Sequence, residues 1–320
     1  VKPADYRHAL RDVVAKCIFG VDRNPMALEL ARMALWLEGF EEGPPLSFLD
    51  HHLQCGDALL GLTDLNALEY GISKAAFKAL SGDEKPVCTA LGKANTAALK
   101  QLEKNRKSPQ FKLPLEQASQ LAELQAIEAM PQRTTKQIAK QEAAYLAFLD
   151  MAKHSPLRHA ADMLLGAFLM AKTEDTEAQI PTTAHLYLEL VNDQHNEQHL
   201  SVRHQAMQAC ADASVFHWPL AYPQVFAQGG FDCVLGNPPW ERIKLQEEEF
   251  FATRSTDVTD AKNKAERAQQ IQWLSEGMLA KHLHPEIPHP DHECMAEVRL
   301  YNEFVTAKRT AELLRQRQAA

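Results

Sequence analysis

Residues 17–40, CIFGVDRNPMALELARMALWLEGF, contain the pattern that decides the fold. The short apolar run at 17–22 predicts a buried strand that ends at Asp22. Asn24 suits the N-cap of a following helix, and Pro25 suits its first position. Apolar residues then recur on one helical face, at Met26, Leu30, Met33, Leu37 and Phe40.

The segments on either side continue this alternation. Residues 5–16 have helical spacing, and residues 51–57, HHLQCGD, predict a second short strand that ends in Gly-Asp. The order helix, strand, helix, loop, strand is typical of a doubly wound parallel sheet. The next candidate strand, FDCVLG at 231–236, follows only after a very long connection. Ordinary connections in such sheets take a few residues, so the connection must contain an insertion.

The insertion is rich in Ala, Gln, Lys and Glu, which favour helices. It is therefore expected to form a helical bundle or hairpin, after which residues 216–226, FHWPLAYPQVF, return the chain to the sheet. Helices are predicted within the insertion at 115–130, 135–172, 181–193 and 198–212, and beyond the sheet at 260–281 and 292–317.

The composition bounds the class of protein. The chain of 320 residues is 45 % hydrophobic and 24 % charged, which suits a globular protein. Its six cysteines are scattered without a CxxC pair, as expected in a reducing cytosol, and we predict a cytoplasmic location. No apolar run has the length of a membrane helix. The net charge of −8 excludes a uniformly basic DNA coat but leaves room for a local basic cleft.

The apolar run at 231–236 leads directly into Asn237, Pro238, Pro239 and Trp240. The amide oxygen of Asn237 and the carbonyl of Pro238 are both acceptors, and the proline rings restrict the backbone that carries them. Two convergent acceptors can hold both hydrogens of one amino group, and the indole of Trp240 offers a face on which a base can stack. A rigid turn beside a core Trp would be the structural alternative.

Two carboxylates follow the first two predicted strands. Asp22 stands where doubly wound folds bind ribose hydroxyls, although a cap for the following helix explains it equally well. Asp57 stands in the same place after the second strand, where a carboxylate can accept a hydrogen bond from an exocyclic amine. A Gly-Asp surface turn is the alternative for Asp57.

The order GVD-N-P, CGD and strand-NPPW resembles the amino-methyltransferases that use S-adenosylmethionine. The longer blocks PLSFLDHHLQCGDALLG and GGFDCVLGNPPWERIKLQEEEFF look like the large adenine-N6 DNA methyltransferases of restriction–modification and BREX-like phage-defence systems. The resemblance covers residues 5–62 and 214–255. It implies a partial doubly wound, Rossmann-like α/β fold that carries a large helical insertion.

The resemblance implies roles for particular residues. Asp22 matches the residue that holds the cofactor ribose, and Asp57 matches the residue that contacts the cofactor adenine amine. Asn237, Pro238, Pro239 and Trp240 match the catalytic motif, into which the target adenine is flipped from double-stranded DNA. No metal is implied, and an endonuclease or defence-system subunits are expected as fused or associated partners.

Four segments are expected on this basis. Residues 1–62 form the first part of the methyltransferase domain, and residues 63–213 form the helical insertion. Residues 214–255 form the second part with NPPW, and residues 256–320 form a helical C-terminal segment. The Gly-rich loop of the family, which wraps the methionine part of the cofactor, has no counterpart here. We therefore expect an internal fragment that binds S-adenosylmethionine poorly or not at all by itself.

Other functions remain open at this point. A protein-glutamine N5-methyltransferase uses a related motif, usually with Tyr in place of Trp240. A non-catalytic subunit could keep the fold as a DNA-binding or scaffold module. The hypothesis of a nicotinamide dehydrogenase would explain Asp22 but would assign no role to Asn237 and Trp240. A His-rich loop at 281–294 lacks the regular spacing of a zinc site, and a basic stretch at 100–112 has the composition of a solvated helix end as well as of a phosphate contact.

Overall fold

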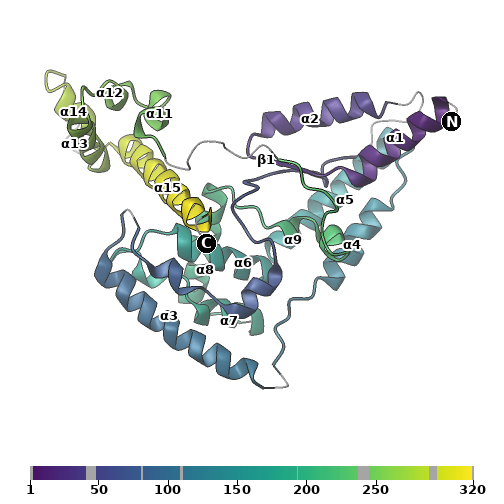
Figure 1. Cartoon of the computed structure of the whole chain (residues 1–320), viewed down its shortest axis with the longest axis horizontal. Helices are drawn as coiled ribbons and strands as arrows, with labels where there is room; N and C mark the ends of the chain where they lie inside the picture. Colours follow the sequence, from purple (N-terminus) through teal and green to yellow (C-terminus); the bar gives the residue numbers. More distant parts are fainter. Residues whose placement is uncertain are drawn as a thin grey trace. The chain divides into compact units, whose positions relative to one another are not determined.

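The computed structural model describes residues 3–40, 48–80, 82–108, 111–192, 194–236, 245–287 and 294–318. These residues are mostly helical (Figure 1). Their sheet has two strands. They group into two compact units. The first contains Val1–Lys78, Pro86–Met170 and Glu174–Leu235, and the second contains Ala79–Lys85, Ala171–Thr173 and Gly236–Ala320. Among the described helices, none combines the length and apolarity that crossing a membrane requires.

The first unit begins with a parallel βαβ motif. Helix α1 (Pro3–Cys17) precedes strand β1 (Gly20–Asp22), helix α2 (Pro25–Glu38) and strand β2 (Leu53–Cys55). The strands pair in parallel, with Asp22 opposite Cys55. The Asn24 side chain accepts a hydrogen bond of 2.9 Å from the Met26 N–H, so it caps α2 as its sequence position indicates. The predicted βα alternation is confirmed for these elements.

Helix α2 leaves its apolar face exposed. Of its fourteen residues only Leu28 is buried, whereas Leu30 is 61 % exposed. The exposed residues are the ones that the sequence places on one face: Met26, Leu30, Met33 and Leu37, with Phe40 just beyond the helix. The periodicity therefore identifies an apolar face correctly, but no described element covers it.

Residues 214–226 return to the strand pair, which confirms the return predicted for residues 216–226. Asp57 and Val215 form a parallel bridge, and the Phe216 N–H donates to the Leu60 carbonyl at 2.8 Å. The approach is close enough to require glycine at Gly61, where φ is +154° and a Cβ atom would lie 1.9 Å from the Phe216 oxygen. The Tyr222 hydroxyl then donates to two carbonyl oxygens, that of Gly20 at the start of β1 and that of His52 directly before β2.

The prediction of a buried strand at 231–236 is wrong. These residues form no strand, and Leu235 is 92 % exposed. A strand needs a neighbour that takes its backbone N–H and C=O groups, and the described residues place none beside this segment. Phe231 is held nevertheless, because its ring packs edge-on against Phe19 and Trp218 at centroid distances of 5.5 and 5.7 Å.

The predicted insertion is helical. The single long helix predicted at 135–172 is wrong, because the structure has two helices there, α5 (Thr135–Lys153) and α6 (Pro156–Leu169). Ser155 caps the start of α6, and Pro156 lacks the backbone N–H that would continue α5, so the first helix ends before it. The helices are η1 (Leu65–Tyr70), η2 (Lys74–Phe77), α3 (Lys85–Arg106), α4 (Ala118–Glu128), α5 (Thr135–Lys153), α6 (Pro156–Leu169), η3 (Glu177–Gln179), α7 (Thr183–Val191) and α8 (Glu197–Asp212), with α9 (Trp218–Ala221) and α10 (Pro223–Phe226) after them.

Helix α6 is the central helix of this region. It packs against α7 and α8, and eleven of its fourteen residues are buried. Gly166 permits a close approach of α6 to α8, because a Cβ atom there would lie 2.8 Å from the Ala206 Cβ on α8. A second apolar cluster joins α4 and α5 through Leu124, Ile127, Tyr145 and Phe148.

The second unit has its own core. Its helices are α11 (Glu247–Ala252), α12 (Thr256–Thr259), α13 (Lys264–Ser275), α14 (Leu279–Leu283) and α15 (Met295–Gln318). Its apolar cluster includes the buried side chains of Phe250, Phe251 and Phe304. Helix α15 is also tied to residues 79–85 by a buried ion pair, in which the Arg309 guanidinium donates to Asp83 at 2.6 Å. Burial raises the Asp83 pKa, but the Arg309 hydrogen bond and charge outweigh this and the net shift is downward.

The fold prediction is thus confirmed in part. The parallel βαβ motif and the helical insertion are observed, whereas the complete doubly wound sheet stays a prediction. The four predicted segments, divided at residues 62, 213 and 255, also stay predictions. The two compact units are defined by contacts within the structure, whereas the four segments were defined by resemblance to a family, so the units do not test them.

Candidate active site

Both predicted cofactor carboxylates lie at the same edge of the strand pair. Asp22 is the last residue of β1, and Asp57 follows the end of β2 by two residues. The Gly56 N–H donates to the Asp22 carbonyl at 3.0 Å, which keeps the two strand ends in register. The carboxyl edge of a parallel sheet is where open α/β folds bind their ligands.

Asp22 is exposed beside the start of α2. Its Oδ1 accepts the Asn24 N–H at 2.7 Å, so the carboxylate stabilises the turn into the helix. This observation supports the capping role weighed for Asp22. The exposure of the side chain keeps a carboxylate oxygen accessible to the hydroxyl hydrogens of a ligand as well.

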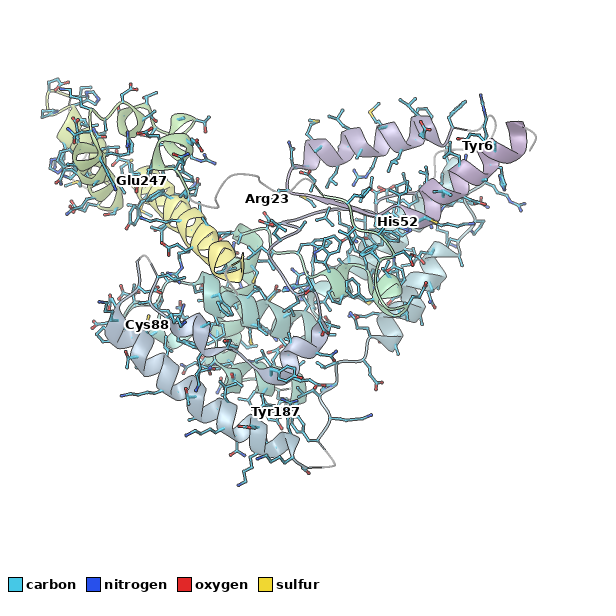
Figure 2. All side chains as sticks on the ribbon, viewed as in Figure 1. Tyr6, Arg23, His52, Cys88, Tyr187 and Glu247 are labelled. Atoms are coloured by element: carbon cyan, nitrogen blue, oxygen red, sulfur yellow. The ribbon has the colours of Figure 1, made fainter. Side chains whose placement is uncertain are left out.

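Asp57 is only 6 % exposed, and both of its carboxylate oxygens have partners. Oδ1 accepts the Leu59 N–H at 2.9 Å, and Oδ2 lies 3.5 Å from Nη1 of Arg23. Arg23 directly follows β1 and is labelled in Figure 2. Sequence analysis missed this residue, although an Arg placed between one strand-end Asp and the next helix was a signal for such a pair. A ligand amine at Asp57 would replace the exposed guanidinium.

The predicted catalytic residues Asn237, Pro238, Pro239 and Trp240 lie outside the described residues. The structure describes the segment directly before them, which is held in place at Phe231. Phe231 packs against Phe19 at the beginning of β1, and the chain then proceeds through exposed residues 232–236.

An open groove lies at the opposite edge of the strand pair. Its volume is about 1220 Å³, and its lining includes His51, His52, Glu128 and Gln224. His52 directly precedes β2 and is labelled in Figure 2, while Glu128 ends α4. Burial lowers the pKa of His51 to about 3 and that of His52 to about 4, so both imidazoles are neutral near pH 7. Burial also raises the Glu128 pKa.

The groove residues were not identified from the sequence as a group. His51 and His52 lie in HHLQCGD, while Glu128 is far away along the chain. The adjacent histidines were the one available signal, and their proximity to Glu128 depends on tertiary packing.

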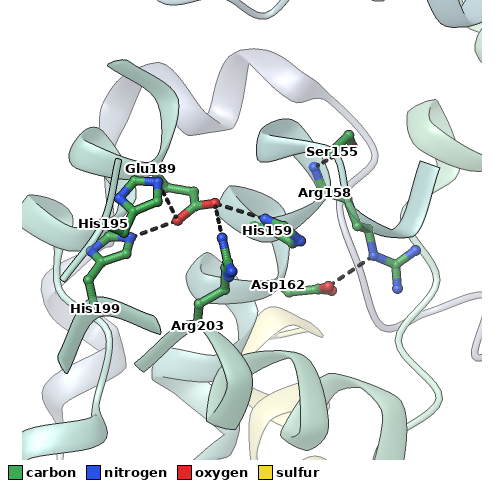
Figure 3. A network of polar contacts seen from close by, with 8 residues as sticks. All are labelled: Ser155, Arg158, His159, Asp162, Glu189, His195, His199 and Arg203. Atoms are coloured by element: carbon green, nitrogen blue, oxygen red, sulfur yellow. Dashed lines mark hydrogen bonds and ion pairs between the residues drawn. The ribbon is translucent and has the colours of Figure 1, made fainter. Parts of the chain in front are cut away.

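A second polar cluster ties the helices of the insertion together (Figure 3). Buried Glu189 on α7 bonds His159 Nδ1 on α6 at 2.8 Å and His199 Nε2 on α8 at 2.6 Å. Arg203 Nη1 lies 3.4 Å from the same carboxylate. Burial raises the pKa of Glu189, but the two histidine hydrogen bonds outweigh burial and hold the pKa at about 2. The cluster is a buried structural network.

A related network connects α6 with the segment that follows β2. The Leu62 N–H donates to Nδ1 of buried His217, which assigns the ring hydrogen to Nε2. That Nε2 lies 3.0 Å from Asp162, which also accepts from Arg158. The insertion is thereby attached to the βαβ motif through satisfied hydrogen bonds.

The remaining candidates of the sequence do not gather in this way. In the loop at 281–294, the described His282 stacks on Trp273 and His284 lies 3.5 Å from Glu286, whereas residues 288–293 are outside the described range. In the basic stretch at 100–112, Arg106 lies over the Tyr70 ring at 4.5 Å.

Comparison with known proteins identifies the relationship. The model of the Eco57I restriction-modification methylases matches residues 16–272. The chain belongs to the Eco57I restriction-modification methylase family. The matched range includes Asp22, Asp57 and the segment from Asn237 to Trp240. The prediction of a restriction–modification methylase is therefore confirmed at the level of the family.

A curated relative agrees with the family. The chain is 22 % identical over 261 residues to a protein of Methanocaldococcus jannaschii described as a candidate type II restriction enzyme and methyltransferase. The similar region covers 78 % of this chain and 20 % of the relative, so the chain spans about a fifth of the length of that relative. No solved structure matches the chain.

Proposed function

We propose that the protein is a site-specific DNA methyltransferase that transfers a methyl group from S-adenosylmethionine to the N6 amino group of adenine. Its setting would be a restriction–modification or BREX-like phage-defence system. The observation that carries the proposal is that a chain of the restriction-modification methylase family holds two carboxylates at the carboxyl edge of a parallel βαβ motif.

The carboxyl edge suits the nucleoside part of the cofactor. Exposed Asp22 would accept the hydrogens of the ribose hydroxyls, and Asp57 would accept a hydrogen from the adenine amine. Arg23, which now pairs with Asp57, is largely exposed and can move aside when the cofactor enters. The two carboxylate acceptors therefore fit the hydroxyl and amine donors of the nucleoside.

Residues 237–240 would supply the methyl-transfer step. The Asn237 amide oxygen and the Pro238 carbonyl would accept the two N6 hydrogens, which directs the nitrogen lone pair at the methyl group. Pro239 would stiffen the loop, and Trp240 would stack on the flipped adenine. The bound cofactor supplies a methyl group already activated on a sulfonium, so the residues contribute positioning and electrostatics without a metal.

The test is methyl transfer to DNA by the full-length protein that contains this chain. Labelled S-adenosylmethionine and double-stranded DNA should give N6-methyladenine, detected by mass spectrometry of nucleosides. Asn237→Ala should abolish the product while leaving cofactor binding largely intact. Trp240→Ala should reduce it about fivefold or more, because stacking on a base contributes on the order of 1–3 kcal/mol.

The exposed Asn66, which lies in η1, provides the matched control. Asn66→Ala should methylate DNA like the wild type. Methylation of a protein glutamine in place of DNA would favour the glutamine N5-methyltransferase. A folded protein that binds DNA but transfers no methyl group would favour the non-catalytic scaffold module. Either result would overturn the proposal.

Cofactor binding is tested separately. Asp22→Ala should weaken binding of S-adenosylmethionine in the full-length protein about tenfold, since a hydrogen bond to a charged group contributes about 1.5–3 kcal/mol. Calorimetry measures the change. Equal affinity in the variant would leave Asp22 with only its observed role in the turn before α2.

A further inference from the structure

The groove at the amino edge of the strand pair contains a cluster that methyl transfer does not use. One ligand-capable atom from each of His51, His52 and Glu128 lies within 4.8 Å of the others. We propose that these three side chains form a binding site for a transition-metal ion of the zinc type. Two imidazoles and one carboxylate are a ligand set that zinc accepts.

The spacing between two of these groups favours an ion over a hydrogen bond. Nε2 of His51 lies 3.7 Å from Oε1 of Glu128, which is too long for a hydrogen bond. Zinc bonds of roughly 2.0–2.1 Å in a tetrahedral arrangement separate neighbouring ligands by about 3.4 Å. A shift of a few tenths of an ångström would bring the pair to ligand spacing.

The surrounding hydrogen bonds orient two of the ligands. Nδ1 of His52 lies 3.1 Å from the Ile18 carbonyl, which can only accept, so Nδ1 carries the hydrogen and Nε2 keeps the lone pair. The Gln224 Nε2 donates to Glu128 Oε1 at 3.1 Å. Metal-binding histidines and carboxylates usually have such outer partners.

Two buried polar atoms at the cluster have no partner among the described residues. They are Nδ1 of His51 and Oε1 of Gln224. Buried polar atoms in proteins are normally satisfied by protein groups, water or an ion. Orphaned atoms beside a carboxylate and two imidazoles indicate that a bound, hydrated species belongs in this part of the groove.

The two imidazoles are also held firmly. The His51 ring stacks on Phe48 at a centroid distance of 5.3 Å, and the His52 ring stacks on Phe19 at 4.0 Å. Both side chains are buried, whereas the cluster borders an open groove. Three protein ligands beside an open groove leave one position for water, as in zinc sites with an accessible coordination position.

The Glu189 cluster is a weaker candidate for the same ion. Its carboxylate is occupied by hydrogen bonds of 2.6 and 2.8 Å from His199 and His159. The Arg203 guanidinium lies 3.4 Å from the same group and would repel a cation. The described contacts therefore occupy the Glu189 carboxylate, whereas the Glu128 carboxylate accepts a hydrogen bond from Gln224 and lies 3.7 Å from His51.

The test is metal binding by the 320-residue chain and a matched pair of variants on α4. Glu128→Gln removes the carboxylate ligand, whereas Glu123→Gln makes the same charge change at an exposed position of the same helix. After exposure to Zn²⁺ and gel filtration, the wild type and Glu123→Gln should retain one zinc per chain. Glu128→Gln should bind at least tenfold more weakly.

Co²⁺ reports the geometry independently, because tetrahedral cobalt gives intense visible absorption. That absorption should appear in the wild type and be lost in Glu128→Gln and in His51→Ala, with circular dichroism confirming that each variant is folded. If His51→Ala fails to fold, the Glu128 pair decides alone. Absence of stoichiometric zinc, or zinc retained equally by both Glu variants, would overturn the proposal, and the latter would direct attention to the loop at 281–294.

Discussion

Helices α2 and α6 have the same length and the same kind of start, but their surroundings are opposite. Each has fourteen residues, a side-chain cap, Asn24 or Ser155, and proline at its first position. Eleven residues of α6 are buried between α7 and α8, whereas α2 buries Leu28 alone. An apolar side chain contributes about 1.5–3 kcal/mol when it is fully buried, so the two helices differ greatly in what packing contributes.

The difference shows that the periodicity of apolar residues predicts which face of a helix is apolar but does not predict which element covers that face. In the insertion, the faces of α6, α7 and α8 cover one another, and the Glu189 network fixes their alignment. In the βαβ motif, α2 contacts the strands, but Met26, Leu30, Met33 and Leu37 remain exposed among the described residues. We expect the insertion to be the more self-sufficient region of the two.

The largest effect is expected in α6. Leu165 is 1 % exposed, so Leu165→Ala should remove apolar contacts and leave a cavity. The expected loss is about 2–5 kcal/mol in the free energy of unfolding, measured with urea. A loss below about 1 kcal/mol would mean that the helices of the insertion repack freely, and the contrast with α2 would fail.

The Glu189 network predicts a dependence on pH. The folded-state pKa of Glu189, about 2, lies below the ordinary value of 4.5, so the carboxylate stabilises the fold above pH 4.5 and this contribution is lost as pH falls toward 2. The contribution is up to about 3 kcal/mol. Glu189→Gln should be less stable than the wild type at pH 7, and the gap should narrow below pH 4.5 in urea titrations.

The exposed Glu197, on the same helix as His199, gives the control for this change. Glu197→Gln removes the same charge and should keep a small, constant difference from the wild type between pH 7 and pH 3. A gap for Glu189→Gln that does not vary with pH would show that the network is not held by an ionised carboxylate.

Two glycines sharpen the contrast between close and ordinary helix packing. In Gly166→Ala the new Cβ would lie 2.8 Å from Ala206, so α6 and α8 must separate, at a net cost of about 1–2 kcal/mol. In Gly92→Ala on α3 the new Cβ would lie 3.6 Å from the Phe77 Cβ, an ordinary contact. That variant should gain up to about 1 kcal/mol from helix propensity. Thermal unfolding of the pair should therefore shift in opposite directions.

The smallest effect is expected on the exposed face of α2. Leu30→Ala should change the free energy of unfolding by less than about 0.5 kcal/mol, since 61 % of Leu30 is exposed. The measurement is the same urea titration used for Leu165→Ala, performed at several protein concentrations. A loss comparable to that of Leu165→Ala, or one that varies with concentration, would show that this face is covered in solution.

Much of the local structure could be predicted from the sequence. The cap at Asn24, the proline at 25 and the strand that ends at Asp22 define β1 and α2, because these signals act within a few residues. The return of residues 216–226 was also predicted. The strand predicted at 231–236 is absent, since an apolar run becomes a strand only beside a neighbour that the local sequence does not specify.

The residues of the candidate site likewise fall into those that local sequence signals predicted and those that depend on tertiary contacts. Asp22 and Asp57 were found because parallel strands bring their carboxyl ends to one edge, a consequence of topology alone. Arg23 as the partner of Asp57 was missed although its position after β1 was a signal. The meeting of His51 with Glu128 was missed because no local pattern specifies a contact between residues so distant along the chain.

The sequence by itself determined the membership of the chain in the Eco57I restriction-modification methylase family, the helix–strand–helix–strand order of its first residues and its parallel βαβ motif. These depend on residue type, period and short-range hydrogen bonds. Only the tertiary structure decided that α6 is enclosed while the apolar face of α2 is exposed among the described residues, and that two histidines and a glutamate meet beside the groove. Burial and side-chain convergence depend on which distant surface arrives, and periodicity carries no information about that surface.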